Sequence, residues 1–404
     1  CAALCSNTTG CYNTAIGDWA LRDNTTGIHN NAIGYQSLHL NTTGSDNTAI
    51  GREVLRASTT GGCNVGIGRE ALRSNTEGNY NNAIGYQALC KNTEGDHNQA
   101  IGWCALTSNT TGNKNIGIGS AALQYNTTGG NNTALGENVL MCNTTGCYNT
   151  AIGLNTLRQS LSGDHNFAVG HCALYSNWGG CYNTAIGKEA MLCNTTGILN
   201  TAMGCRALGC NTIGSYNIGI GESSLYNVVS GNENVAVGRE ALYNNKGACY
   251  NVAIGDEALR KTGCIPGNTA KENVGVGFKV LQSNTTGYQN TAVGTLALQA
   301  NTQGYVNTAV GVCALYSNTT GNWNTAIGRE SMKHSTTGDC NVIIGPESMM
   351  AANEGSCNVG VGAQVLYDNT TGNYNVALGW RALYGSLSGD YNFAAGHCAL
   401  YSNW

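Results

Sequence analysis

Small, aliphatic and polar residues recur along the chain with a period of 17 residues. The Asn of residues 13–17 (Asn-Thr-Ala-Ile-Gly) is taken here as position one, and the same five-residue core returns 17 residues later, again and again. Position three is Ala or Gly, position four is Ile, Val, Leu or Met, and position nine is Leu or Met, with Ile343 and Ala395 as the visible exceptions. All 23 cores have Asn at position one and Gly at position five. A fixed short period of this kind indicates a repeat architecture.

A 17-residue unit cannot bury an apolar face by itself, so it must stack on its neighbours. The pattern predicts a short strand over the core, a corner at its Gly, a second short segment through Ala-Leu at positions eight and nine, and another corner at Asn-Thr-Thr-Gly. That tetrapeptide, as at 7–10, favours a turn because Asn supports an Asx-type turn and Gly adopts positive φ.

A helical repeat is the alternative, because residues 69–73 (Arg-Glu-Ala-Leu-Arg) have helical propensity. Two corners per unit leave less chain than the roughly 10 to 12 residues that a helix needs. We therefore predict an all-β fold, a parallel β-solenoid (β-roll) of about 24 rungs, with at most a single helical turn at Ala-Leu.

The chain is expected to form a single continuous domain over residues 1–404. The register slips once, by a five-residue insertion at 264–268, where Pro266 predicts an outward loop because proline cannot donate to a ladder. Residues 160–178 return almost unchanged at 386–404. The chain begins at Cys1 without Met, and both ends keep the repeat pattern instead of a polar cap. These features favour a segment of a longer chain, or rods that join end to end.

Two apolar columns and one polar column are expected along the solenoid. Ile at position four and Leu at position nine are the predicted core, and the small residues at positions three and eight are expected to allow close packing on a second surface. The asparagines at position one predict a ladder in which each amide stacks on the next. Its first members are Asn13, Asn30, Asn47, Asn64, Asn81 and Asn98.

Composition and motifs exclude several function classes. Charged residues make up 10% of the chain, the net charge is −4 and no Lys/Arg cluster occurs, so we expect no nucleic-acid partner. No apolar run approaches the roughly 18 residues of a membrane span, so no membrane insertion of this segment is expected. No catalytic grouping stands out, and neither an enzyme activity nor a cofactor is predicted. His171-Cys172 and His397-Cys398 suggest metal binding, but no second Cys or His occupies the matching column one rung away.

Nineteen cysteines without CxxC spacing favour an oxidising location, either extracellular or on a cell or virion surface. Cysteines in one column on adjacent rungs would have Cα atoms ~4.8 Å apart, which a disulfide allows. The candidate pairs are Cys193 with Cys210, Cys340 with Cys357 and, beside the insertion, Cys249 with Cys264. Because the number is odd, at least one thiol stays unpaired within the chain, and the candidates for bonds between chains are Cys1, Cys5, Cys11 and Cys398.

Ten Asn-Thr-Thr triplets match the N-glycosylation sequon, although the turn interpretation is preferred because successive rungs would crowd the glycans. Their asparagines are Asn7, Asn24, Asn41, Asn109, Asn126, Asn143, Asn194, Asn284, Asn318 and Asn369. The threonines of these turns could form a flat ice-binding array, which Glu77, Glu94, Trp178 and Lys246 interrupt. Tyr and Trp recur before the core Asn and after Leu, where they could bind sugars, cover backbone edges or meet another subunit.

Residues 81–89 (Asn-Asn-Ala-Ile-Gly-Tyr-Gln-Ala-Leu) and 149–153 resemble the Ala-Ile-Gly head repeats of trimeric autotransporter adhesins, and look equally like repeats of phage tail-fibre-type proteins. The resemblance covers essentially the whole chain and implies a parallel β-roll, often trimeric, with an adhesive or fibre function. We therefore expect a structural subunit of an extracellular filament or fibre, whose partners are copies of itself, end to end or lateral. The alternatives are an adhesin or tail-fibre shaft that binds a receptor or surface glycans, and an ice-binding solenoid.

Overall fold

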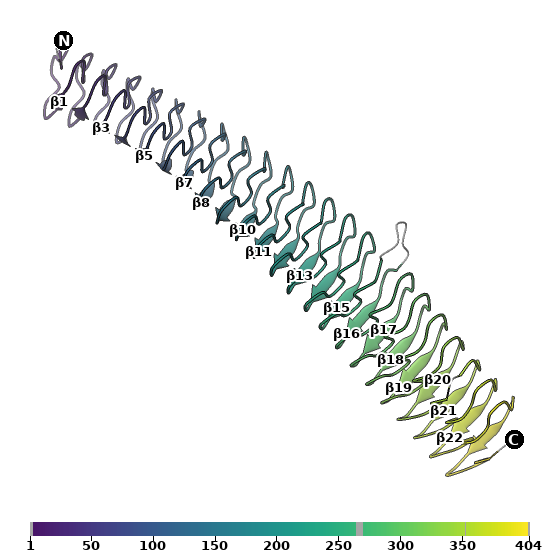
Figure 1. The fold of residues 1–404 in the computed structure, drawn as a ribbon. Helices are drawn as coiled ribbons and strands as arrows, with labels where there is room; N and C mark the ends of the chain where they lie inside the picture. The colour runs from purple at the N-terminus through teal and green to yellow at the C-terminus, as the bar shows by residue number, and fades with distance from the viewer. Residues whose placement is uncertain (1–2, 264–269, 352, 403–404) are drawn as a thin grey trace. The chain divides into compact units, whose positions relative to one another are not determined.

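In a computed structural model, which describes residues 3–263, 270–351 and 353–402, each 17-residue unit forms one coil with one three-residue strand. Each coil carries one strand, drawn as an arrow in Figure 1, and the strand occupies positions two to four of the unit. The strands are β1 (Thr14–Ile16), β2 (Asn31–Ile33), β3 (Thr48–Ile50), β4 (Val65–Ile67), β5 (Asn82–Ile84), β6 (Gln99–Ile101), β7 (Ile116–Ile118), β8 (Thr133–Leu135), β9 (Thr150–Ile152), β10 (Phe167–Val169), β11 (Thr184–Ile186), β12 (Thr201–Met203), β13 (Ile218–Ile220), β14 (Val235–Val237), β15 (Val252–Ile254), β16 (Val274–Val276), β17 (Thr291–Val293), β18 (Thr308–Val310), β19 (Thr325–Ile327), β20 (Val342–Ile344), β21 (Val359–Val361), β22 (Val376–Leu378) and β23 (Phe393–Ala395).

The chain divides into two compact units, Cys1–Ile198 with β1 to β11 and Leu199–Trp404 with β12 to β23. In the first unit each strand pairs in parallel with the next in the chain, and equivalent positions face each other. The second unit is built in the same way. The predicted parallel β-solenoid with 17-residue coils is therefore confirmed in both units.

The insertion does not disturb the ladder of the second unit. Strand β15 pairs directly with β16, and Val252 faces Val274 although 22 residues separate them instead of 17. The predicted loop at 264–268, with Cys264 and Pro266, lies outside the described residues.

Hydrogen bonds between neighbouring coils continue around the whole circuit of the backbone. The N–H of Gly34 donates to the carbonyl of Ile16 at 2.7 Å beside the strand, that of Leu21 to Ser37 at 3.0 Å and that of Thr25 to Thr42 at 3.0 Å. Positions six to eleven form turns, and no helix occurs in the ranges given above. The helical turn that we allowed at Ala-Leu is therefore absent, because the residues at positions seven and nine have positive φ, such as +62° at Trp19 and +50° at Leu21, which a right-handed helix does not allow.

The Gly at position five makes the corner after each strand. Its φ is positive in every coil, for example +128° at Gly17, a region that L side chains rarely adopt. A Cβ at Gly17 would also lie 2.7 Å from the carbonyl oxygen of Gly34 in the next coil. Conformation and close approach together explain why this column contains only glycine.

The core consists of positions three, eight and nine, so the prediction that position four lies in the core is wrong. Ala151 at position three is fully buried, whereas 37% of Ile152 at position four is exposed. Side chains alternate across a strand, so positions two and four share the outer face when position three points inward. The large buried side chains are the Leu and Met residues of position nine.

A larger residue at position three needs a smaller neighbour, because Ile343 is fully buried there and a Cβ at Gly360 in the next coil would lie 3.0 Å from its Cδ1. A Cβ at Gly66 would lie 2.5 Å from Cγ1 of Val54, and one at Gly360 would lie 2.8 Å from Cγ2 of Val365. The small residues of positions three and eight are thus the core itself and not a second packing surface.

Candidate functional site

The outer face of the sheet carries no charge and combines an apolar row at position four with a mainly polar row of Thr, Asn and Gln at position two. No residue in any of the 23 strands is charged, and position four contributes a large aliphatic side chain or Met in every strand except β23. We call these position-four side chains the aliphatic column. In the first unit it comprises Ile16, Ile33, Ile50, Ile67, Ile84, Ile101, Ile118, Leu135, Ile152, Val169 and Ile186, all half-buried or exposed. An exposed apolar row of this length is typical of an interaction surface.

Charged side chains gather instead on the turn that follows the Gly corner. Arg69 at position six pairs with Glu70 at 3.1 Å, and Arg239 pairs with Asp256 of the next coil at 3.0 Å. The arginine of each pair is about half-exposed to solvent, which limits what the pair contributes to stability. The position of these pairs leaves the sheet face without the charges that commonly prevent association of exposed strands.

The position-one asparagines form a buried ladder of amides. The amide of Asn47 donates from Nδ2 to Oδ1 of Asn30 at 3.1 Å and to the carbonyl of Gly61 at 2.9 Å. The backbone N–H of Asn47 donates to the same Oδ1 at 3.1 Å. Equivalent backbone-to-amide bonds join Asn13, Asn30, Asn47, Asn64, Asn81 and Asn98 in sequence.

A second amide ladder, which sequence reasoning missed, runs through position 12. Asn41 donates from Nδ2 to Oδ1 of Asn24 at 2.8 Å and to the carbonyl of Gly44 at 2.9 Å. All ten sequon asparagines lie at position 12, and apart from exposed Asn7 they are fully buried. In all ten sequons Nδ2 donates to the Gly carbonyl three residues later. The folded chain therefore engages the nitrogen that a glycan would need.

Serine interrupts the position-12 ladder. Ser160 is fully buried, and its Oγ has no hydrogen-bond partner among the described residues. One coil earlier, Oδ1 of Asn143 has none either. The same loss occurs at Ser58 and Asn41. A serine side chain is too short to reach the amide of the preceding coil, so each serine leaves an acceptor unsatisfied.

Replacing Ser160 with asparagine is expected to stabilise the first unit by about 1 to 2 kcal/mol, because Asn143 would regain a donor. Urea unfolding followed by circular dichroism measures the change. Ser162→Asn is the matched control, since Ser162 is exposed in the adjoining turn. An equal gain in both variants would contradict the ladder explanation.

The turn threonines do not present a complete hydroxyl array. At position 13, Thr25 donates from Oγ1 to the carbonyl of Thr42 at 3.0 Å, and Thr42 donates to Thr59 at 3.1 Å. The threonines that remain exposed in these coils are those at position 14, such as Thr26 and Thr43. In these coils an ice-binding surface could therefore use only the position-14 hydroxyl of each turn.

Aromatic rings stack along the coil columns. In the first unit His165 lies between Tyr148 and Tyr182, with centroids 4.8 Å apart on both sides and nearly parallel planes. In the second unit Tyr374 stacks on Tyr391 at 5.0 Å. An aromatic ring binds a sugar through its exposed face, and within a stack the neighbouring ring covers that face. The stacks therefore favour mutual packing of aromatic side chains over sugar binding.

The predicted disulfides stay predictions, and the structure places their cysteines as follows. Cys340 and Cys357 are free thiols, and burial, followed by the neighbouring Cys357, raises the pKa of Cys340. Cys249 is a half-buried thiol whose predicted partner Cys264 lies outside the described residues. Cys193 and Cys210 belong to different units. Of the proposed intermolecular thiols, Cys5 and Cys11 are exposed and Cys398 is half-buried, while Cys1 lies outside the described residues.

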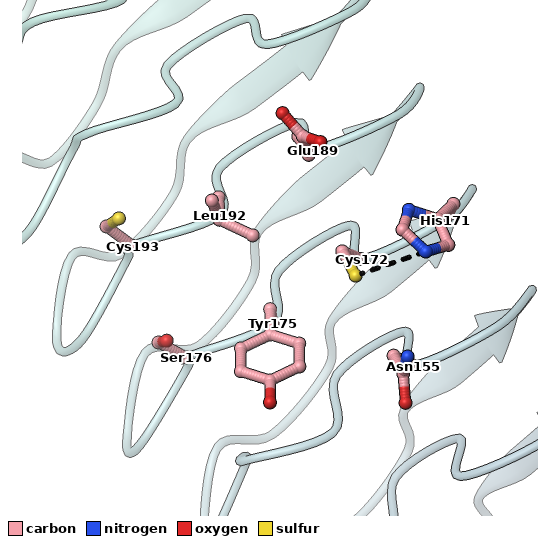
Figure 2. Close-up of a pocket in the computed structure, with 8 residues that line it drawn as sticks. All are labelled: Asn155, His171, Cys172, Tyr175, Ser176, Glu189, Leu192 and Cys193. Carbon is pink, nitrogen blue, oxygen red and sulfur yellow. Dashed lines mark hydrogen bonds between the residues drawn. The ribbon is translucent and has the colours of Figure 1, made fainter.

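Around His171-Cys172 the first unit has an open groove of about 580 Å³ (Figure 2). Its lining comprises Asn155, His171, Cys172, Tyr175, Ser176, Glu189, Leu192 and Cys193. Nε2 of His171 lies 3.7 Å from Sγ of Cys172. Burial, followed by the charge of Glu189, raises the pKa of Cys172, whereas a nucleophilic cysteine needs a lowered pKa. The His-Cys pair therefore lacks the electrostatics of an activated thiolate.

Within the described ranges, no three His, Cys, Asp or Glu side chains lie together as a metal site would require. The same residues include no helix that is long and apolar enough to cross a bilayer. No protein-family model matches the chain, and a comparison with curated proteins finds no match.

Proposed function

We propose that the chain is a structural subunit of an extracellular fibre in which copies of the solenoid associate laterally through the outer face of the sheet. The aliphatic column carries this proposal. Its side chains repeat in register from coil to coil and lie on a face without charge. Contiguous exposed apolar surface is costly in water, and covering it with an equivalent surface removes that cost.

The area of the face supports the same conclusion. Three residues of strand are ~10 Å long and coils repeat every ~4.8 Å, so the eleven strands of the first unit present roughly 500 Å². Two such faces in contact would bury roughly 1,000 Å², which reaches the lower limit of specific protein interfaces. A second copy is a fitting occupant because its face has the same spacing between coils.

Replacing Ile101, Ile118 and Ile152 together with lysine is expected to abolish lateral association. These side chains are exposed in the single chain, so the variant should still fold. Like charges on both faces would then repel each other. Sedimentation velocity and negative-stain electron microscopy measure the assembly, and circular dichroism confirms the fold.

The matched control replaces Thr111, Thr128 and Thr145, which are exposed in the turns of the same region, with lysine. The original chain and this control should form species larger than the 42.0 kDa monomer. Assembly that persists in the isoleucine variant would overturn the proposed interface. A monomeric original chain that binds a receptor or glycans would favour the shaft of an adhesin or tail fibre instead.

A further inference from the structure

Tyrosine rings stack directly on one another in the second unit. Tyr367, Tyr384 and Tyr401 form one row with centroid distances of 4.8 and 5.0 Å and interplanar angles of 4° and 5°. Tyr374 and Tyr391 form a second row on the same coils, with centroids 5.0 Å apart and planes within 2° of parallel. Both rows follow from the 17-residue register, because residues in one column share one direction.

Exposure separates the second row from an ordinary packing contact. The exposed fractions of Tyr374 and Tyr391 are 53% and 76%, which leaves the ring edges accessible to solvent. Two equivalent phenols that point the same way bring the carbon atoms ortho to their hydroxyls close together. Coupling of two tyrosyl radicals joins such carbon atoms.

We propose that Tyr374 and Tyr391 form a site of oxidative cross-linking, at which a peroxide-dependent oxidant converts the stacked pair into dityrosine. The bond would connect two successive coils covalently. The row of Tyr367, Tyr384 and Tyr401 offers a second such site on the adjoining surface. The inference goes beyond the proposed fibre function, because it rests on stacking inside one chain and would hold for a monomer.

The reaction balances with hydrogen peroxide as the oxidant and a haem peroxidase as the catalyst. Each phenol loses one electron and its hydroxyl proton, and the two radicals form one carbon–carbon bond between their ortho positions. Each bonded carbon then loses its hydrogen, which returns to the phenol oxygen as the ring regains aromaticity. Two C–H bonds are replaced by one C–C bond, and the two electrons and two protons reduce one peroxide to two waters.

The first unit supplies an internal contrast. Tyr148 and Tyr182 occupy the same column position as Tyr374 and Tyr391, and their exposed fractions of 56% and 57% are similar. His165 lies between them, so their rings do not touch. Exposure alone would make the two pairs equally reactive, whereas stacking selects Tyr374 and Tyr391.

Cys357 competes for the radical at Tyr374. The neighbouring Cys357, followed by Tyr391, raises the pKa of Tyr374, which places the thiol against the phenol. A thiol can reduce a tyrosyl radical, so the experiment is carried out in a Cys340→Ser, Cys357→Ser background as well as in the original chain.

The test treats dilute full-length chain with horseradish peroxidase and limiting hydrogen peroxide, then measures dityrosine fluorescence and maps linked peptides by mass spectrometry. We expect the yield of the Tyr374–Tyr391 link to be at least about tenfold higher than that of any Tyr148–Tyr182 link. The two stacked rings are already in contact, so their radicals couple without first having to meet by diffusion. Tyr391→Phe should remove the link, and the matched Tyr182→Phe should leave it unchanged. His165→Tyr should create new links in the first unit.

Several results would overturn the proposal. They are equal yields from the two columns, links that join different chains at low concentration, and no gain from His165→Tyr in a variant that circular dichroism shows to be folded. A thioether to Cys357 in the original chain, with no dityrosine in the serine background, would also refute the site.

Discussion

Replacing Asn109 with aspartate is expected to destabilise the first unit by about 3 to 5 kcal/mol, because it places an uncompensated charge in the interior. Asn109 is fully buried at position 12. It donates from Nδ2 to Oδ1 of Asn92 at 2.8 Å and to the carbonyl of Gly112 at 2.9 Å, while its Oδ1 accepts from Asn126 at 2.8 Å. A carboxylate cannot donate a hydrogen bond, so Oδ1 of Asn92 and the carbonyl of Gly112 would each face another acceptor oxygen.

The same substitution four residues later is the control. Asn113 is exposed at position 16, where its Oδ1 accepts the backbone N–H of Asp96 at 2.6 Å. Aspartate keeps that acceptor, and Asp164 already has the equivalent role with Cys147. Asn113→Asp should therefore change the free energy of unfolding by less than about 1 kcal/mol. Guanidinium unfolding of both variants provides the comparison, and similar losses would show that the position-12 ladder is not a buried network.

Two adjacent substitutions in β9 should differ almost as strongly. Ala151→Asp is expected to cost about 3 to 5 kcal/mol, since Ala151 is fully buried and a carboxylate in its place would be an unpaired buried charge. Ile152→Asp should cost about 1 kcal/mol or less, as its side chain is on the outer face. Thermal unfolding and hydrogen exchange of the β8 to β10 region measure both. A larger loss of stability in Ile152→Asp than in Ala151→Asp would show that position four belongs to the core.

The sequence predicts the parallel pairing and its register because a one-residue slip would misalign every column of the repeat. It did not reveal which side of the strand faces inward, since hydrophobicity alone favours Ile152 over Ala151. The polar residues at position two could have indicated the outer side, because Asn31 and Gln99 lie on the same face of the strand as position four. Polar residues at position two indicate an outer face, and the alternation of a strand then places position three inside.

The position-12 ladder was missed for a different reason. Asn-Thr-Thr-Gly is sufficient to predict a turn, and the bond from Asn41 to Gly44 is such a local contact. The bond from Asn41 to Asn24 depends on the neighbouring coil, which local turn chemistry does not describe. The aromatic rows likewise require the column register, and the exposed ring edges become apparent only when coils are stacked.

The serines that interrupt the position-12 ladder also have a mechanical consequence. In a stacked array each coil is held mainly by its two neighbours, so strain travels from coil to coil until it meets a weaker junction. Ser58 and Ser160 provide such junctions on either side of the unbroken run from Asn75 to Asn143. Under load, a rupture that begins outside this run should stop at one of the serines. The chain would then yield in separate blocks, and its force–extension curve would rise and fall in steps instead of ending in a single break.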